Sequence, residues 1–185
     1  MHGIAIVSKL SRGFTSNGSA NNVTVFDLKT LKTIGHVPVG RNPDSIFYDP
    51  VANRVFTFNG RSKDSTAIDA ATLGVVGTIP LGGKPEFSIS DGTGRIYVNI
   101  EDTSEIAVLD TRKLVVIKRY RLTGCEEPSG LAMDVRHRRL FSVCGNKVSD
   151  GGNGSGCREA AGDVADWRGF GRSRVRSRAW ACLQL

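Results

Sequence analysis

The chain has 185 residues, of which 39% are hydrophobic and 23% are charged, and its formal net charge is +7. This length predicts one domain, and no apolar run approaches the ~18 to 20 residues that a membrane helix needs. Residues 1–148 mix acidic with basic side chains along their length, which favours an ordinary solvated surface over a nucleic-acid site. We therefore expect neither membrane insertion nor nucleic-acid binding.

From the N-terminus onward, short strand-like segments follow one another with tight turns between them. They alternate apolar and polar residues, are rich in β-branched and aromatic side chains, and are separated by Asp-Pro, Asp-Gly and Asn-Gly pairs. In the stretch that is easiest to divide, we expect four strands at Ser45–Tyr48, Val55–Asn59, Ser65–Asp69 and Val75–Pro80.

These segments belong to a repeat of about 42 residues. Gly40, Gly82 and Gly124 stand 42 residues apart, and a proline with an acidic neighbour follows each of them. Four strands in 40 to 45 residues are typical of a propeller blade, whereas the coils of a solenoid are usually shorter. The sequence therefore predicts an all-β fold, a partial β-propeller of about three to three and a half four-stranded blades over residues 1–148, with an irregular C-terminal tail.

One phrase of the repeat carries a family resemblance. Arg95–Asn99 has the sequence Arg-Ile-Tyr-Val-Asn, and looser copies occur at Arg54–Asn59 and Arg12–Asn17. They resemble the naming motif of the YVTN-type β-propeller repeat proteins of bacteria. The resemblance implies a propeller, usually of seven blades and exported to the periplasm or secreted, but it implies no single chemistry. Met1–Val7 is too short for a signal peptide, so the chain as it stands is expected to be cytoplasmic.

Residues 149–185 depart from the repeat. They are rich in Gly, Arg, Ser and Ala and lack strand alternation, so we expect a disordered tail outside the propeller. One interpretation is an RGG-like nucleic-acid segment at Trp167–Arg172. We favour a frameshift after about Val148, because the single codon of Trp167 encodes glycine in a shifted frame, 43 residues after Gly124 and in phase with the repeat. Resequencing the gene tests this hypothesis.

Candidate binding residues lie in the loops that a propeller gathers at one mouth of its channel. An acidic ring of Asp44 and Glu86 with Glu126 or Glu127, tempered by Arg61 and Lys84, would suit a cation, an amine or a sugar. The alternative is that these side chains only cap turns and stay solvated. The full candidate set is His2, Asn17, Asp44, Asn59, Arg61, Glu86, Glu101, Glu126 and Glu127.

Other chemistry has little support in the sequence. No C-x-x-C or H-E-x-x-H metal motif, G-x-S-x-G turn or dinucleotide loop occurs, so we expect no metal, cofactor or catalytic residue. Cys125 precedes one strand and Cys144 ends the strand expected to pair with it, which leaves two possibilities, a disulfide or two buried thiols.

Three functional hypotheses follow. The first is a non-enzymatic propeller module that binds a small ligand or a protein partner at the channel mouth. The second is an enzyme that resembles the lactonase or quinoprotein propellers. The third is compatible with the first: this chain alone has no activity, because an incomplete ring leaves sheet faces and edges open and is prone to aggregation.

Overall fold

The computed structural model describes residues 2–147 and 178–185. These residues form short antiparallel strands and two single-turn 3₁₀ helices, η1 (Ser8–Leu10) and η2 (Glu101–Thr103). The strands are β1 (Ile4–Val7), β2 (Arg12–Asn17), β3 (Asn22–Asp27), β4 (Thr33–Pro38), β5 (Pro43–Asp49), β6 (Arg54–Asn59), β7 (Asp64–Asp69), β8 (Val75–Pro80), β9 (Pro85–Ser90), β10 (Arg95–Ile100), β11 (Glu105–Asp110), β12 (Val115–Arg121), β13 (Leu131–Asp134), β14 (Arg139–Lys147) and β15 (Arg178–Gln184).

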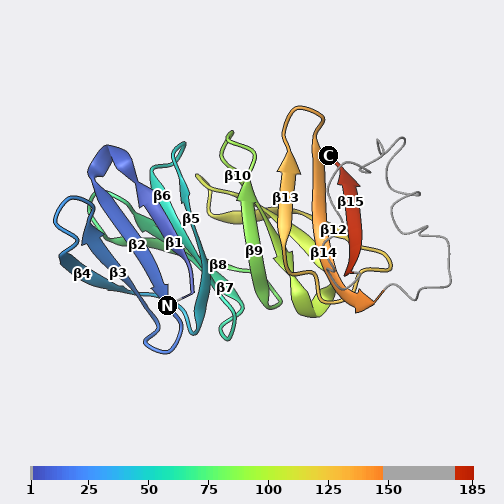
Figure 1. Ribbon diagram of the computed structural model, residues 1–185, viewed down its shortest axis with the longest axis horizontal. Coiled ribbons are helices and arrows are strands. Elements are labelled where there is room, and N and C mark those ends of the chain that lie inside the picture. Colours follow the sequence, from blue (N-terminus) through green and yellow to red (C-terminus); the bar gives the residue numbers. More distant parts are fainter. Residues whose placement is uncertain (1, 148–177) are drawn as a thin grey trace, which may run out of the picture.

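Consecutive strands pair into sheets that follow the sequence repeat (Figure 1). β1–β4, β5–β8 and β9–β12 each form a four-stranded antiparallel sheet, and β13, β14 and β15 form a three-stranded one. The four strands expected between residues 45 and 80 correspond to β5–β8, with β8 matching at both ends. Even the irregularities repeat, because each outer strand pairs through a bulge at the same place in its sheet. The predicted fold class, a partial propeller, is confirmed.

In the second and third sheets the middle strands are buried on both faces, because a neighbouring sheet covers each side. In β6, Val55 belongs to the apolar cluster shared with the first sheet, while Phe56 and Phe58 belong to the cluster shared with the third sheet. A further cluster, which includes Tyr97 and Leu140, joins the third and fourth sheets. Alternating apolar residues therefore join each sheet to its neighbours, on both sides in the second and third sheets.

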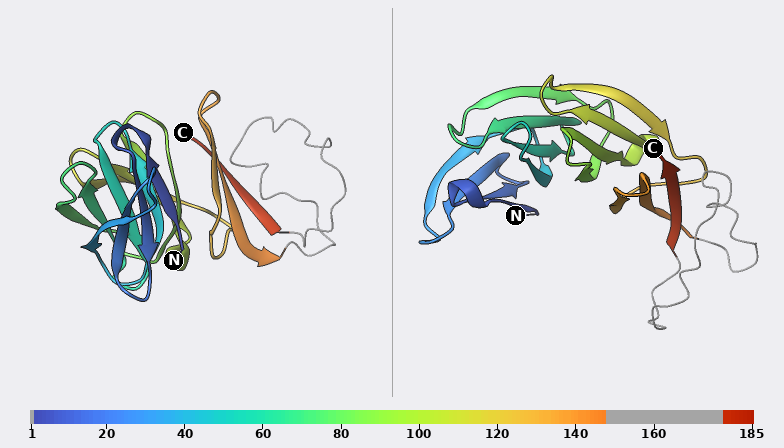
Figure 2. Two further views of the ribbon diagram at one scale, coloured as in Figure 1. Left: turned by 60° about the vertical axis from the view of Figure 1, so that its left-hand side comes forward. Right: turned by 90° about the horizontal axis from the view of Figure 1, so that it is seen from above.

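The stacked sheets form an open arch (Figure 2). The innermost strands β1, β5, β9 and β13 line its concave side, and the outer strands β4, β8 and β12 form its convex side. Among the described residues, no helix is long and apolar enough to cross a membrane.

The C-terminal segment differs in part from the expectation of a tail without strands. β15 pairs with β14 along most of its length and completes a third strand of the fourth sheet. Its apolar run, Ala179–Leu183, explains why a strand is compatible with this sequence. Residues 148–177, where the disordered tail and the frameshift were expected, lie outside the described residues.

Candidate functional site at the channel mouth

The concave side carries a groove of about 490 Å³, which we call the inner groove. Three neighbouring inner strands and the residues just before them line it: His2–Ile4, Asp44–Phe47 and Glu86–Ile89. Successive residues of a strand point to opposite faces, and each inner strand therefore turns part of its side chains toward the groove.

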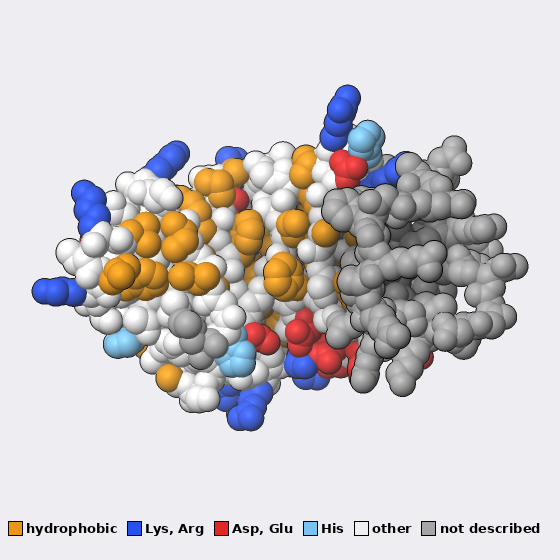
Figure 3. Space-filling model, in the orientation of Figure 1, with side chains coloured by type: hydrophobic (Ala, Val, Ile, Leu, Met, Phe, Trp, Pro, Cys, Tyr) orange, Lys and Arg blue, Asp and Glu red, His pale blue; other side chains and the backbone are white. Residues whose placement is uncertain are grey.

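The floor of the inner groove is apolar. Ile4 is 58% exposed and Phe87 is 55% exposed, whereas Ala5 and Val7, which alternate with the exposed residues of β1, are buried between sheets. Figure 3 shows rows of hydrophobic side chains across this concave face. Exposed apolar surface of this kind marks a binding surface more often than an ordinary solvated one.

Charged side chains border the groove at the end where β5 and β9 begin. His2 Nδ1 lies 3.2 Å from Asp44 Oδ1, and Lys84 Nζ lies 2.9 Å from Glu86 Oε1 and also pairs with Glu101. We call these five residues the ionic rim. Figure 3 shows acidic and basic side chains together along this lower border.

Burial and contacts within the ionic rim shift the pKa values of two of its members, Glu86 and Lys84. Partial burial raises the pKa of Glu86, and its neighbour Glu101 adds to the effect, while Lys84 opposes it. The pKa of Lys84 is raised well above its usual range, chiefly by its hydrogen bond to Glu101. A lysine held between two carboxylates stays protonated, and the raised pKa of Glu86 makes its carboxylate easier to protonate than an ordinary glutamate.

Sequence reasoning missed part of this border. Lys63 Nζ lies 2.7 Å from Asp102 Oδ2, and Asp102 Oδ1 accepts a hydrogen bond of 2.8 Å from the backbone N–H of Lys84. Asp102 therefore links the loop after β10 to the turn after β6. Asp102 directly follows the predicted residue Glu101, and Lys63 lies two positions after the predicted Arg61, so proximity in the sequence was the available signal.

Two predicted site residues, Asn17 and Asn59, form hydrogen bonds within their own sheets. The Asn17 amide donates to Asn22 Oδ1 and Thr24 Oγ1, at 2.8 Å each, and the Asn59 amide makes the equivalent pair of bonds within its own sheet. Asn59 is completely buried. These amides brace the turn between the second and third strands of a sheet, a local contact that sequence spacing alone does not distinguish from ligand binding.

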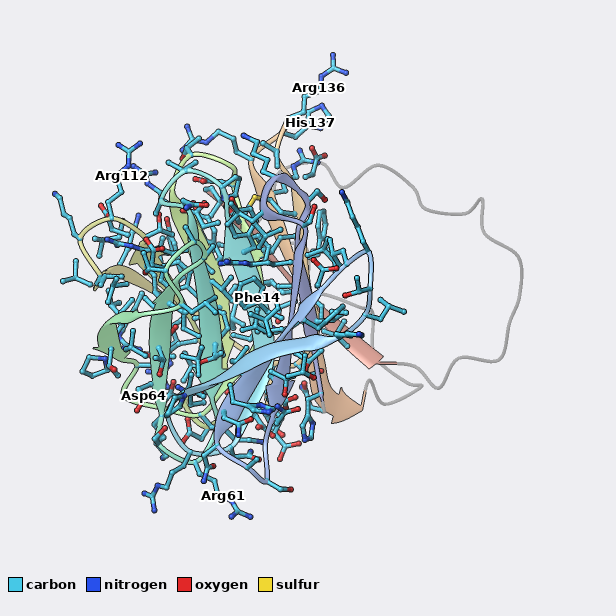
Figure 4. The ribbon with its side chains drawn as sticks, turned by 90° about the vertical axis from the view of Figure 1, so that its left-hand side faces the viewer. Phe14, Arg61, Asp64, Arg112, Arg136 and His137 are labelled. Atoms are coloured by element: carbon cyan, nitrogen blue, oxygen red, sulfur yellow. A yellow bond between two sulfur atoms is a disulfide. The ribbon has the colours of Figure 1, made fainter. Side chains whose placement is uncertain are left out.

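Three more predicted residues lie away from the inner groove. Arg61, Glu126 and Glu127 are exposed and do not line it. Figure 4 places Arg61 at the end of the molecule opposite Arg136. The expected acidic ring is therefore reduced, within the described residues, to Asp44 and Glu86 with the neighbouring Glu101.

The linker before β13 is held by a disulfide. Cys125 and Cys144 are bonded, both are buried, and both belong to the apolar cluster between the third and fourth sheets. In the part of the chain that the structure describes, no group of three or more His, Cys, Asp or Glu side chains is arranged to hold a metal ion.

No protein-family model and no curated protein matches the chain. Solved structures do. The chain is similar to a structure named Kuenenia stuttgartiensis hydrazine synthase, with a TM-score of 0.70 and 23% identity over 77% of this chain and 41% of that one. It is also similar to dihydro-heme d1 dehydrogenase NirN in complex with DHE, with a TM-score of 0.63 and 15% identity over 76% of this chain and 32% of that one. The chain thus spans less than half of each, and at these identities the likeness shows the fold alone.

Proposed function

We propose that the chain is a non-enzymatic segment of a YVTN-type propeller that binds a small amphipathic amine at the channel mouth. One observation carries the proposal: exposed aromatic and aliphatic side chains in the inner groove lie directly beside a border with an excess of carboxylates. That border consists of His2, Asp44, Lys63, Lys84, Glu86, Glu101 and Asp102.

An amine with an apolar body satisfies both parts of the groove. Phe87 offers a face for the apolar body and for cation–π attraction, and Asp44 and Glu86 offer charge-assisted hydrogen bonds to an ammonium group. The excess of carboxylates over lysines disfavours an anion at the same place. A concave apolar site with a few convergent polar groups is the usual form of a small-molecule site.

Calorimetric titration with phenethylammonium tests the proposal, with 2-phenylethanol as the neutral analogue of the same shape. We expect the amine to bind more tightly than the alcohol. The double variant Asp44→Asn, Glu86→Gln should weaken amine binding roughly fivefold, about 1 kcal/mol, because each carboxylate is partly screened by solvent.

The matched control is Glu126→Gln, Glu127→Gln, which removes the same charge from exposed positions outside the groove and should leave the affinity unchanged. Equal binding of amine and alcohol would contradict the role of the rim. Lack of saturable binding by either probe would contradict the site itself.

A propeller enzyme is the second candidate, because both solved neighbours carry the names of enzymes. This candidate predicts a stoichiometric metal or coloured cofactor in the purified protein. Elemental analysis and an absorption spectrum distinguish the two, since the binding module needs neither.

We also propose that the complete protein works in an oxidising compartment, the periplasm or the cell exterior. The Cys125–Cys144 disulfide supports this proposal, since disulfides persist mainly in such compartments. Fractionation of the cells that make the protein tests it, and recovery with a soluble cytoplasmic marker would contradict it.

A further inference from the structure

The first sheet leaves exposed a face that the next two sheets bury. Leu31, Leu73 and Leu114 occupy the same place in their repeats, in the turn before the outer strand, and all have positive φ. Leu73 packs against the cluster shared with the first sheet, and Leu114 packs against the cluster shared with the second. Leu31 has no sheet before it among the described residues and is 73% exposed.

Two neighbours of Leu31 repeat the pattern. Phe26 and Leu28 are partly exposed, whereas their equivalents in the second sheet, Ile68 and Ala70, are completely buried against the first sheet. We call Phe26, Leu28 and Leu31 the first end face. It has the composition of a surface made to be covered by another sheet of the same repeat.

The opposite end of the arch carries the complementary surface. β6 begins with Arg54 and then turns Phe56 and Phe58 onto the next sheet, where both are completely buried. β14 has Arg139, Phe141 and Val143 at the same offsets, but Phe141 and Val143 are only partly buried. We call these three residues the last end face.

An arginine clamp shows how such faces join. Arg12 Nη1 donates to the carbonyl oxygens of Ala70 and Ala71, and Arg54 Nη1 donates to those of Thr111 and Arg112, at 2.7 and 3.0 Å. In both cases the arginine begins the second strand of one sheet, and the acceptors lie in the turn before the outer strand of the next.

Each end of the arch holds one unused half of this clamp. Arg139 starts β14 as Arg54 starts β6, and its guanidinium donates to no carbonyl oxygen of the described chain; its Nε is buried without a partner, whereas Arg12 and Arg54 make the clamp with Nη1. The carbonyl oxygens of Leu28 and Lys29, which correspond to the clamp acceptors of the second sheet, accept from no arginine of the described residues. Donor and acceptor thus lie at opposite ends of one molecule.

We propose that two copies of this chain close into a single ring, with the last end face of each copy covering the first end face of the other. A second copy supplies at each end the clamp half and the apolar cover that the described residues of the other copy do not provide, by an interface that continues the contacts already present between the sheets of one chain. Two copies provide eight sheets, within the four to eight blades that propellers commonly have. A head-to-tail contact closes into a ring when its rotation allows and otherwise forms a filament, and the arch in Figure 2 presents its two end sheets on either side of one concave space.

Sedimentation velocity of the full chain across a concentration series tests the proposal. We expect a species of twice the chain mass that dissociates on dilution. Leu31→Asp places a carboxylate in the apolar contact, and Arg139→Ala removes the clamp donor, so each should raise the dissociation constant at least about tenfold. Val75→Asp, at an exposed position of β8 outside both end faces, and Arg61→Ala are the matched controls and should leave it unchanged.

Mixing the two interface variants tests the head-to-tail arrangement. A copy with Leu31→Asp keeps an intact last end face, and a copy with Arg139→Ala keeps an intact first end face. The mixture can therefore form one undamaged interface, with both substitutions confined to the other, and should associate more tightly than the weaker of the two variants alone. Circular dichroism of each variant establishes that it is folded. A monomer at all concentrations, a species of three or more copies, or a mixture no tighter than the weaker of its two components would each overturn the proposal.

Discussion

Single aspartates fix the turns that precede the outer strands. Asp27 Oδ1 accepts hydrogen bonds from the backbone N–H groups of Lys29 and Thr30, and Asp69 accepts the equivalent bonds from its own turn. These bonds stabilise the charged carboxylate, and as a result the pKa of each aspartate lies below its usual value of 3.8. The Asp110 turn behaves in the same way.

This arrangement predicts an acid dependence of stability. A carboxylate with a lowered folded-state pKa stabilises the fold fully above about 3.8, and that contribution is lost as the pH falls through the lowered value. The variant Asp27→Asn, Asp69→Asn should therefore show a shallower decline in the free energy of unfolding below pH 4 than the parent. Urea unfolding at successive pH values measures it. The control Glu126→Gln, Glu127→Gln should keep the parent slope, and equal slopes in all three proteins would refute the assignment.

At the scale of single residues, the sequence predicted the positions of the candidate site residues unevenly. His2, Asp44 and Glu86 do meet at the inner groove, because the repeat places the start of each inner strand at the same end of the arch. Asn17 and Asn59 brace their own sheets instead. A short polar side chain beside a turn has the same sequence signature whether it binds a ligand or braces its own sheet. Only the distances to its neighbours in the structure distinguish the two roles.

Strands and hairpins followed closely from the sequence, since alternation and turn residues act over a few positions. The positions of β5–β8 were predicted to within two residues for this reason. β15 was not predicted, because its pairing with β14 joins segments about forty residues apart in a stretch with no repeat signal. Contacts between distant elements depend on packing that local patterns do not encode.

The Cys125–Cys144 disulfide ties the linker before β13 to β14. Their sequence separation is 19 residues, and closing a loop of that size stabilises a fold by about 3 kcal/mol in the chain-entropy model. Reduction, or the variant Cys125→Ser, Cys144→Ser, should lower the free energy of unfolding by roughly this amount. Urea unfolding with and without dithiothreitol measures the loss. The double variant is the control and should not respond to dithiothreitol, whereas an unchanged parent in reductant would contradict a stabilising bond.

In the whole molecule, stability rests on contacts between successive sheets. Three apolar clusters each span one boundary between sheets, so every sheet is held chiefly by its neighbours, as in other repeat proteins. The 42-residue spacing predicted that the sheets stack, but it did not predict which residues form hydrogen bonds across the boundaries between them. An arginine recurs in the sequence at the start of β2 and of β6, yet the carbonyl oxygens that accept its hydrogen bonds lie 57 to 59 residues further along the chain.

The arginine clamp should therefore matter for the cohesion of the stack. Arg54→Ala removes two hydrogen bonds to carbonyl oxygens across the boundary between the second and third sheets, and we expect a loss of about 1 to 2 kcal/mol in the free energy of unfolding. Arg54→Lys should recover only part of it, because the shorter lysine side chain ends before the position of Nη1, the atom that donates both bonds. Arg61→Ala, at an exposed turn, should change stability by less than about 0.5 kcal/mol. Urea unfolding with an unchanged m-value measures these differences, and equal stability of the Arg54→Ala and Arg61→Ala proteins would show that apolar packing alone joins the sheets.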